Sequence, residues 1–274
     1  MPELPEVETI RHGLEKHLVG NTIVDVEIRL AKQFTGEPKN IIGAEVVGVR
    51  RFGKGLVIDL SNGQSIAIHV KMTGQLVIGG RPMTVGNGRY PNKWTHVIFK
   101  LKDIFLYYSD IRQFGWIKII QSSDLKAQSF FRDLGPEPLR DLTQAKFFDI
   151  LQNSRMPIKL LLMDQKKIAG IGNIYANDAL FIAKIHPKRM ASSLTQKEKT
   201  AVFNGIEEVL KKGIEVGGAS EWNYVNALGE KGGYQNFFQV YNREGELCKR
   251  CGGVIERMKM GGRGTFYCPG CQRL

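Results

Sequence analysis

Four cysteines near the end of the chain have the spacing of a metal site. Two C-x2-C pairs, Cys248 with Cys251 and Cys268 with Cys271, are separated by sixteen residues. Four thiolates in this pattern match the tetrahedral coordination of Zn²⁺, whereas a disulfide within each pair would close a strained small loop. A redox-active site would need only one such pair. The cysteines therefore predict one structural zinc ion.

The second group that could do chemistry is the amine of Pro2, if Met1 is removed. A neutral secondary amine can attack a sugar carbon, and the resulting iminium ion withdraws electrons and promotes elimination of the neighbouring phosphate. Glu3 would lie beside the same carbon and transfer protons. The alternative is that Pro2 and Pro5 only begin a helix, where proline is favoured. These residues alone favour that alternative.

The chain is strongly basic, with 274 residues, a formal net charge of +12 and an isoelectric point near 9.5. This excess is typical of proteins that bind a polyanion such as nucleic acid or an acidic membrane surface, although it can also be ordinary solvated charge. No apolar run is long enough to span a membrane, and the acidic N-terminus is unlike a signal peptide. We expect a soluble, cytoplasmic protein.

The elements that must position these groups change in type along the chain. Apolar residues spaced by threes and fours predict a helix over residues 4–18. Short β-branched runs between residues 22 and 120 then predict a β-sandwich or barrel. The expected strands are 22–28, 45–52, 56–60, 65–70, 96–101, 104–108 and 116–120.

Helical periodicity returns after a Gly- and Pro-containing break at residues 134–139, which predicts a linker. The long helix that we expect over 195–216 begins with a capping box formed by Thr195 and Glu198. Residues 217–235 are rich in Gly and polar residues, and predict an exposed functional loop. The remaining expected elements are helices at 143–152, 157–163 and 173–184, and a hairpin of 254–260 and 265–267 turned at Gly261 and Gly262.

Six motifs, in this order, resemble those of the bacterial formamidopyrimidine-DNA glycosylases. They span the chain and are MPELPEVET (1–9), DIRQFG (110–115), LGPEPL (134–139), LMD (162–164), GNIY (172–175) and the cysteine hairpin. The resemblance implies an α+β fold with an N-terminal β-sandwich, a helix-two-turn-helix module and a C-terminal zinc-finger β-hairpin. The expected domains are a catalytic domain over 1–130, a helical domain with the lesion-recognition loop over 131–235, and the finger over 236–274.

The resemblance also implies an activity in base excision repair. We expect a bifunctional DNA glycosylase and apurinic/apyrimidinic lyase that removes 8-oxoguanine and formamidopyrimidines through a Schiff base and nicks the strand by β,δ-elimination. The implied partner is double-stranded DNA with a damaged base, bound between domains by a monomer associated with the bacterial nucleoid. The alternatives are a preference for oxidised pyrimidines on the same scaffold, and a non-catalytic binder of damaged DNA, against which Pro2 and Glu3 argue.

Four residues resemble the catalytic residues of the family by position. Pro2 resembles the Schiff-base nucleophile, and Glu3 resembles the acid/base that assists base loss. Lys54 resembles a lysine that contacts phosphate and donates a proton in β-elimination. Arg263 resembles the finger arginine that binds the phosphates beside the lesion and acts in δ-elimination.

Other residues resemble the family's DNA contacts. Met72, Arg112 and Phe114 match the triad that fills the gap left by a flipped-out base, although without the resemblance Met72 and Phe114 would be interpreted as core residues. The residues expected to contact the DNA backbone are His69, Arg155, Lys159, Asn173 and Tyr241.

The chain departs from the family pattern at three places. Trp94 stands where His is common, and Asp178 stands where Glu is usual. In the lesion loop, residues 221–223 (Glu-Trp-Asn) precede Tyr224, where relatives often have a basic residue followed by Thr or Asp. This loop contacts the flipped base, so its sequence bears on the lesion range. The MPELPE start favours oxidised purines over the endonuclease VIII branch.

Overall fold

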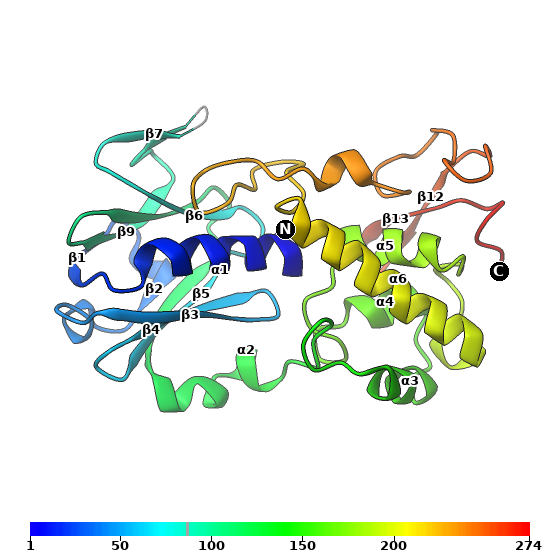
Figure 1. Cartoon of the computed structure of the whole chain (residues 1–274), viewed down its shortest axis with the longest axis horizontal. Helices are drawn as coiled ribbons and strands as arrows, with labels where there is room; N and C mark the ends of the chain where they lie inside the picture. Colours follow the sequence, from blue (N-terminus) through cyan, green and yellow to red (C-terminus); the bar gives the residue numbers. More distant parts are fainter. Residues whose placement is uncertain (86–87) are drawn as a thin grey trace. The chain divides into compact units, whose positions relative to one another are not determined.

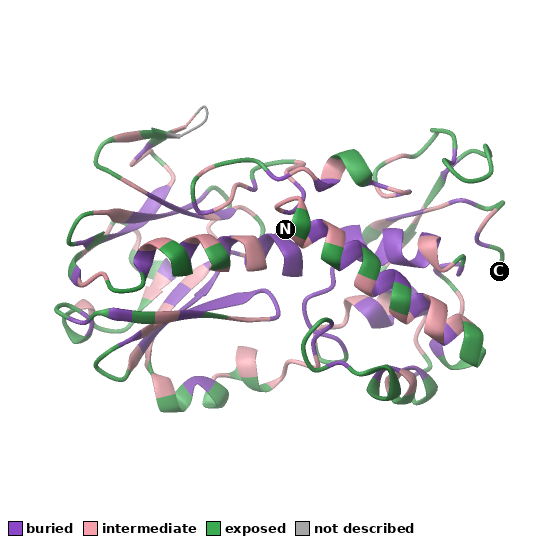
Figure 2. Cartoon of the chain, in the orientation of Figure 1, coloured by how far each residue is buried: buried purple, intermediate pink, exposed green. Residues whose placement is uncertain are grey.

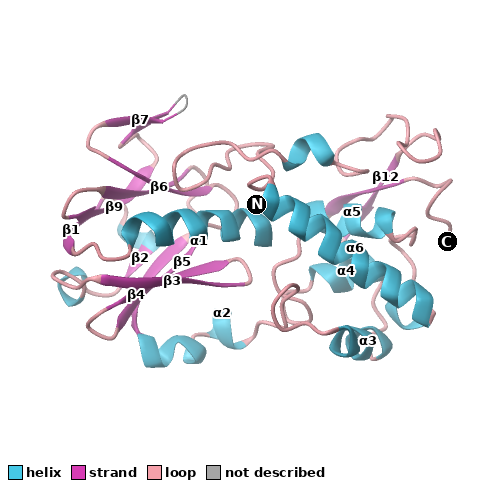
Figure 3. Cartoon of the chain, in the orientation of Figure 1, coloured by secondary structure: helices cyan, strands magenta, loops and turns pink. Residues whose placement is uncertain are grey.

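The computed structural model describes residues 1–85 and 88–274, which fold as two units. The first unit consists of residues 1–132 and 216–233, and the second of residues 133–215 and 234–274. Most strands belong to the first unit and most helices to the second (Figure 3). Within the described ranges, no helix is long and apolar enough to cross a membrane. The expected α+β fold class is confirmed.

Helix α1 (Leu4–Leu18) opens the first unit (Figure 1). At its start, a side-chain oxygen of Glu6 accepts a hydrogen bond from the backbone N–H of Glu3 at 2.7 Å, which satisfies one of the free donors of the first turn. The apolar residues spaced by threes and fours all point into the core, as their spacing predicts. These buried residues are Leu4, Val7, Ile10, Leu14 and Leu18.

Two packed sheets make up the rest of the first unit. One sheet has the order β1-β9-β10-β6 and the other has the order β2-β11-β5-β4-β3. Every pairing is antiparallel except that of β11 with β2. The strands are β1 (Ile23–Ile28), β2 (Phe34–Thr35), β3 (Val46–Phe52), β4 (Gly55–Leu60), β5 (Gln64–His69), β6 (Gly74–Gly79), β9 (Thr95–Leu101), β10 (Phe105–Asp110) and β11 (Trp116–Gln121).

One hydrophobic core joins these sheets to α1. It contains residues from both sheets, such as Ile68 and Leu106, and the inward face of the helix. The expected sandwich is therefore confirmed. Strand β6 was not expected, because its short apolar run between glycines cannot be distinguished from other buried segments by periodicity. A small two-stranded sheet of β7 (Met83–Val85) and β8 (Gly88–Tyr90) and the short helix α2 (Ser129–Arg132) also belong to the unit.

The second unit contains the expected helices and the terminal hairpin. Helix α6 begins with the predicted capping box, because Thr195 Oγ1 accepts from the Glu198 N–H at 3.3 Å and Glu198 accepts from the Thr195 N–H at 2.8 Å. Figure 2 shows buried and exposed residues alternating along this helix. The elements are α3 (Gln144–Gln152), α4 (Ile158–Met163), α5 (Asn173–Ile182), α6 (Gln196–Glu215), β12 (Glu256–Met260) and β13 (Arg263–Tyr267).

The turn of the terminal hairpin lies at the predicted glycines. Gly261 and Gly262 have φ values of 54° and 75°, and Met260 pairs with Arg263 across them. A two-residue turn with positive φ at both positions matches the twist of the flanking strands, and glycine adopts this conformation without strain. The turn therefore makes Arg263 the first residue of β13.

Residues 216–233 pack with the first unit, although they follow α6 in the sequence. The N–H of Ala219 donates to Glu6 at 2.7 Å, and the N–H of Ile78 donates to the carbonyl of Ala227 at 2.8 Å. A Cβ atom at Gly218, which has a φ of +83°, would lie 2.8 Å from the Glu6 side chain, so only glycine fits. This grouping differs from the expected domain 131–235, which joined the loop to the helices.

Candidate active site and zinc centre

The N-terminus of α1 carries the two residues expected to do the central chemistry. Met1 is 43% exposed, whereas Pro2 is buried and Glu3 is 3% exposed. Glu3 is the N-cap residue of the helix. Removal of Met1 would uncover a secondary amine at the positive end of a helix, where a cationic amine is disfavoured. The freed amine would lie at the N-terminus of α1, next to the buried Glu3.

Lys54 lies in the turn between β3 and β4 and is only 5% exposed. Aromatic rings pack around this turn, because the ring centres of Phe52 and Phe131 are 5.7 Å apart. Gly55 leaves room for another ring, since a Cβ atom there would come within 2.6 Å of Phe130. The ammonium group of Lys54 is thus carried by a turn with a well-packed base.

His69 ends β5 beside the same aromatic cluster, with its ring centre 4.9 Å from that of Phe130. Burial, together with the charges of Lys71 and Lys54, lowers the pKa of His69 to about 3. Its Nδ1 accepts from the backbone N–H of Lys71 at 2.9 Å, which leaves the proton on Nε2. At neutral pH, His69 therefore offers a neutral N–H donor and no positive charge.

The three residues of the expected gap-filling triad lie in two loops of the first unit. Met72 is 41% exposed and Phe114 is 57% exposed, which contradicts their interpretation as core residues. The guanidinium of Arg112 lies 4.9 Å from the centre of the Phe114 ring. The exposed Phe114 ring, paired with the Arg112 cation, could take part in a binding surface.

Asp110 holds these two loops together. One of its carboxylate oxygens accepts from the Thr73 hydroxyl at 2.5 Å, and the other accepts from the N–H of Gly115 at 2.8 Å. Thr73 follows Met72, and Gly115 follows Phe114. A single buried carboxylate therefore fixes the backbone next to both exposed apolar side chains.

In the second unit, Lys159 is fully buried, and its ammonium bonds to the finger hairpin. It donates to the carbonyl of Gly264 at 3.1 Å and to the Thr265 hydroxyl at 2.6 Å. The side-chain amide of Asn173 donates to the same carbonyl of Gly264 at 3.1 Å. Lys159 thus does not present its charge at the surface of this unit, as a phosphate contact requires, whereas Arg155 and Arg263 are exposed.

Tyr241 and Asp178 connect α5 with the segment that leads to the finger. The half-buried Tyr241 ring lies 5.4 Å from the ring centre of Phe266. Asp178 is fully buried and accepts from the backbone N–H groups of Val240 and Tyr241 at 3.0 and 3.1 Å. Burial raises the pKa of Asp178 against the effect of these donors. The shorter side chain at position 178 still reaches the backbone.

The four cysteines of the finger fit one zinc ion. Their sulfur atoms all lie within 4.8 Å of one another, with 3.4 Å between Cys251 and Cys268 and 3.9 Å between Cys248 and Cys271. Sulfur atoms on a tetrahedron with bonds of about 2.3 Å lie about 3.8 Å apart. The donor set and its spacing agree with this geometry, which confirms the prediction of a structural zinc site.

The lesion-loop segment lines a pocket of about 710 Å³ in the first unit, opposite residues of β6 and the β8–β9 segment. Gln75 joins the two sides, because its amide donates to the carbonyl of Asn223 and accepts from the Tyr90 hydroxyl at 3.0 Å. Trp222 lines the pocket and is 86% exposed. No sequence motif indicated Gln75 or Tyr90. The apolar run of β6 was the one feature that could have predicted a strand at this wall of the pocket. Aromatic walls with a few fixed polar groups can hold a planar ring.

Comparison with family models gives three matches along the chain. Residues 1–117 match the formamidopyrimidine-DNA glycosylase N-terminal domain, and residues 134–223 match the formamidopyrimidine-DNA glycosylase H2TH domain. Residues 245–274 match the zinc finger found in FPG and IleRS. Curated formamidopyrimidine-DNA glycosylases of Pelotomaculum thermopropionicum and Carboxydothermus hydrogenoformans are 41% and 40% identical to the chain, and each match covers 100% of both proteins.

Solved structures of the Lactococcus lactis enzyme Fpg are similar over the whole chain. Its complex with DNA containing an oxidised pyrimidine has a TM-score of 0.90 and 35% sequence identity, and covers 100% of both chains. A mutant of that enzyme in complex with DNA containing Fapy-dG has a TM-score of 0.91 at the same identity and coverage. A complex with abasic-site DNA has a TM-score of 0.91 and covers 99% of this chain.

Proposed function

The chain belongs to the formamidopyrimidine-DNA glycosylase family, and we propose on that basis that it excises oxidised purines and then nicks the DNA strand as an apurinic/apyrimidinic lyase. Membership makes it a DNA-repair glycosylase for damaged bases. The observation that most directly supports the lyase activity is the N-terminus of α1, where Pro2 follows the exposed Met1 and both Pro2 and Glu3 are buried.

In the proposed reaction, the freed amine of Pro2 attacks C1′ of the damaged nucleotide while the bond from C1′ to the base breaks. Glu3 assists by transferring protons to the departing base and the opening sugar. The iminium ion then loses a C2′ proton, and the bond from C3′ to the phosphate oxygen breaks. A second elimination releases the 5′ phosphate. Lys54 donates a proton in the first elimination, and Arg263 binds the phosphates during the second.

The proposed DNA contacts support this chemistry by taking the base out of the duplex. Met72 and Phe114 enter the space of the flipped nucleotide, and Arg112 donates to the orphaned partner base. The exposure of both apolar side chains supports this role. The residues proposed to bind the DNA backbone are His69, Arg155, Asn173 and Tyr241, with Lys159 acting through the hairpin that carries Arg263.

The pocket beside the lesion loop is the proposed site of the flipped base. Its wall at Gln75 and Asn223 fixes backbone groups that can read a base without specific side chains. The Lactococcus complex with Fapy-dG supports formamidopyrimidines as substrates. A second candidate, preference for oxidised pyrimidines, is supported by the complex of the wild-type Lactococcus enzyme with oxidised-pyrimidine DNA. We expect the exposed side chain of Trp222 to influence the choice between oxidised purines and oxidised pyrimidines.

A panel of lesion duplexes tests the proposal. Protein with a free Pro2 amine is incubated with 8-oxoguanine paired with cytosine, a formamidopyrimidine and an oxidised pyrimidine, with Trp222→Arg beside it. We expect excision of both purine lesions and a borohydride-trapped adduct located on residue 2 by mass spectrometry. A form with a blocked N-terminus should trap nothing. Activity on oxidised pyrimidines alone would establish the second candidate, and undiminished trapping by the blocked form would exclude Pro2.

A further inference from the structure

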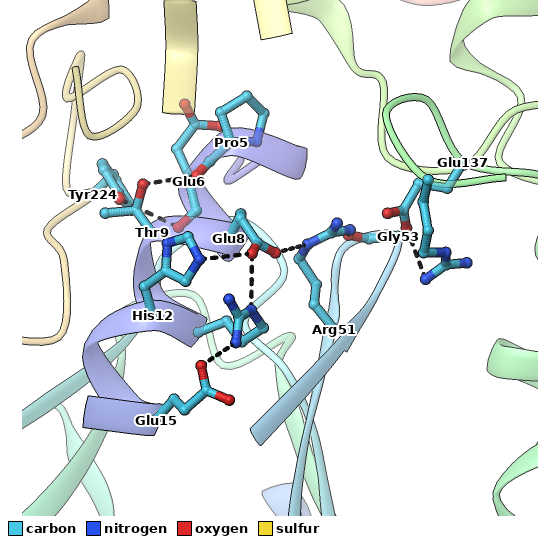
Figure 4. Close-up of polar contacts among 12 residues, drawn as sticks. Pro5, Glu6, Glu8, Thr9, His12, Glu15, Arg51, Gly53, Glu137 and Tyr224 are labelled. Carbon is cyan, nitrogen blue, oxygen red and sulfur yellow. Dashed lines mark hydrogen bonds and ion pairs between the residues drawn. The ribbon is translucent and has the colours of Figure 1, made fainter. Parts of the chain in front are cut away.

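Arg51, near the end of β3, connects α1 to the turn that carries Lys54. Its Nε donates to the carboxylate of Glu8 at 2.6 Å, and one terminal nitrogen donates to the carbonyl of Gly53 at 2.9 Å (Figure 4). The Arg51 side chain is only 9% exposed. One guanidinium therefore bonds a helix side chain and the backbone of the residue that precedes Lys54.

Glu8 is the anchor of this connection on the helix. Besides Arg51, it accepts from Arg11 at 2.8 Å and lies 3.2 Å from the His12 ring nitrogen. Burial raises the pKa of Glu8, but the hydrogen bonds and charges of Arg51 and Arg11 outweigh it and leave the pKa below its usual value. Glu8 is thus ionised at neutral pH, and hydrogen bonds to an ionised group are stronger than neutral ones.

The connection has a direction that the surrounding apolar packing lacks. Aromatic rings such as Phe52 and Phe131 stabilise the base of the turn, but the burial of apolar surface is a non-directional interaction. The planar fork of a guanidinium, by contrast, fixes two acceptors at set distances. Because Glu3 is the N-cap residue of α1, the fork relates the position of the turn to the N-terminus of the same helix.

We infer that Arg51, held by Glu8, is a positioning residue that keeps the Lys54 turn in register with the start of α1. This inference rests on the proposed function, since it assigns Arg51 and Glu8 to the reaction of Pro2 and Lys54. Neither residue touches the reacting atoms. Their contribution is the placement of the Lys54 ammonium relative to the nucleophile.

The test compares two substitutions that remove the same charge from the same helix. Glu8→Gln weakens the anchor of Arg51, whereas the matched control Glu15→Gln removes a carboxylate that bonds Arg11 but is 49% exposed. We expect Glu8→Gln to slow single-turnover strand nicking at a preformed abasic site roughly 10-fold, because Lys54 is proposed to act in that elimination and small misplacements of catalytic groups are costly. Glu15→Gln should change it by less than about 2-fold. Equal losses in the two variants would overturn the inference.

A double-mutant cycle separates positioning from general destabilisation. If Glu8 acts through Lys54, Glu8→Gln should add almost no further loss in a Lys54→Ala background. Two losses that simply multiply would contradict the inference. Arg51→Lys gives a second variant, which retains the charge but not the fork, and should repeat the effect with an unchanged melting temperature. A normal rate of strand nicking in folded Arg51→Lys would count against it.

The outcome is distinguishable from failure of the proposed function. Borohydride trapping on a preformed abasic site, with protein that carries no substitution and has a free Pro2 amine, reports the Pro2 chemistry alone. Absence of that adduct would remove the proposed function and with it this inference. A normal adduct combined with unaffected Glu8 and Arg51 variants would remove only the positioning role.

Discussion

His69 illustrates how burial changes what a residue can offer to DNA. A histidine near phosphate is readily assumed to be a cation, but burial and the nearby lysines lower the pKa of His69 to about 3. Its Nδ1 already accepts the backbone N–H of Lys71, so the free ring position is an N–H. The residue can thus fix the path of a phosphate while contributing no charge to affinity.

The depressed pKa of His69 predicts a specific dependence of stability on pH. Because the folded pKa lies near 3 and the ordinary value is 6.5, the unfolded chain takes up the proton first as pH falls. The stabilisation is therefore complete above pH 6.5 and is lost progressively towards pH 3. Urea unfolding measured at pH 7 and at pH 5 gives the free energy of unfolding at each pH. Between these two values, the unsubstituted protein should lose about 2 kcal/mol more of this free energy than His69→Gln does. Parallel losses would contradict this.

Phe114 should matter only while the lesion base is still stacked in the duplex. Phe114→Ala should slow excision from paired DNA roughly 10-fold, because a stacking aromatic ring contributes on the order of 1–3 kcal/mol. Cleavage of a preformed abasic site should remain nearly unchanged. Single-turnover rates on both duplexes check this, with Val47→Ala as a control that truncates an equally exposed apolar side chain. Equal slowing on both substrates would exclude the wedge role.

At the scale of elements, the finger hairpin depends on the helices that precede it in the sequence. Lys159 on α4 and Asn173 on α5 both donate to the carbonyl of Gly264, directly after Arg263. The N–H of Phe266 donates to Asn177 at 2.8 Å. The start of β13 is therefore fixed by side chains from the helix-two-turn-helix module.

Loss of the Lys159 ammonium should weaken DNA binding while the zinc site is retained. Lys159→Met keeps the side-chain volume but leaves the Gly264 carbonyl and the Thr265 hydroxyl short of a donor. We expect affinity for abasic-site DNA to fall roughly 10-fold, since bonds to charged groups contribute on the order of 1.5–3 kcal/mol. The control Lys167→Met removes the same charge from an exposed position. Similar weakening in both would mean that net charge alone matters.

Zinc and DNA affinity should be lost together when a ligand is removed. Cys268→Ala deletes a buried sulfur atom from the small core that also contains Phe181 and Phe266. The measured zinc content should fall from one ion per chain to none, and the affinity for abasic-site DNA should fall with it. Arg263→Ala should retain zinc and weaken binding to all sequences alike. Fully active protein without zinc would contradict the assignment.

Local patterns predicted the elements well, and contacts between distant residues poorly. Helices α1 and α6 follow from apolar spacing and the capping box of Thr195, both of which are encoded within a few residues. The partnership of Glu8 with Arg51 joins residues far apart in the sequence, and no spacing indicates it. The burial of Lys159 is likewise decided by the hairpin that covers it. Family resemblance supplied positions for the site, but not these partners.

At the scale of the whole molecule, the net charge of +12 predicts strongly salt-dependent binding to DNA. Each cation that neutralises a phosphate contributes about 0.9 to the slope of log affinity against log salt. Arg263→Ala should therefore reduce the slope by about 0.9, whereas His69→Gln should lower affinity without changing the slope. Titrations with an abasic duplex at several salt concentrations measure both. A reduced slope for His69→Gln would show that the bound histidine is charged.

The packing of residues 216–233 on the first unit also limits how genes of related enzymes can recombine. A chimera that takes residues 1–132 from one parent and the remainder from another would seat a foreign loop on Glu6 and Ile78. A foreign loop with a side chain at position 218 would clash with Glu6. The unit that would be inherited together is therefore discontinuous in the sequence, and its transfer between lineages requires crossovers on both sides of residues 216–233 as well as one after residue 132.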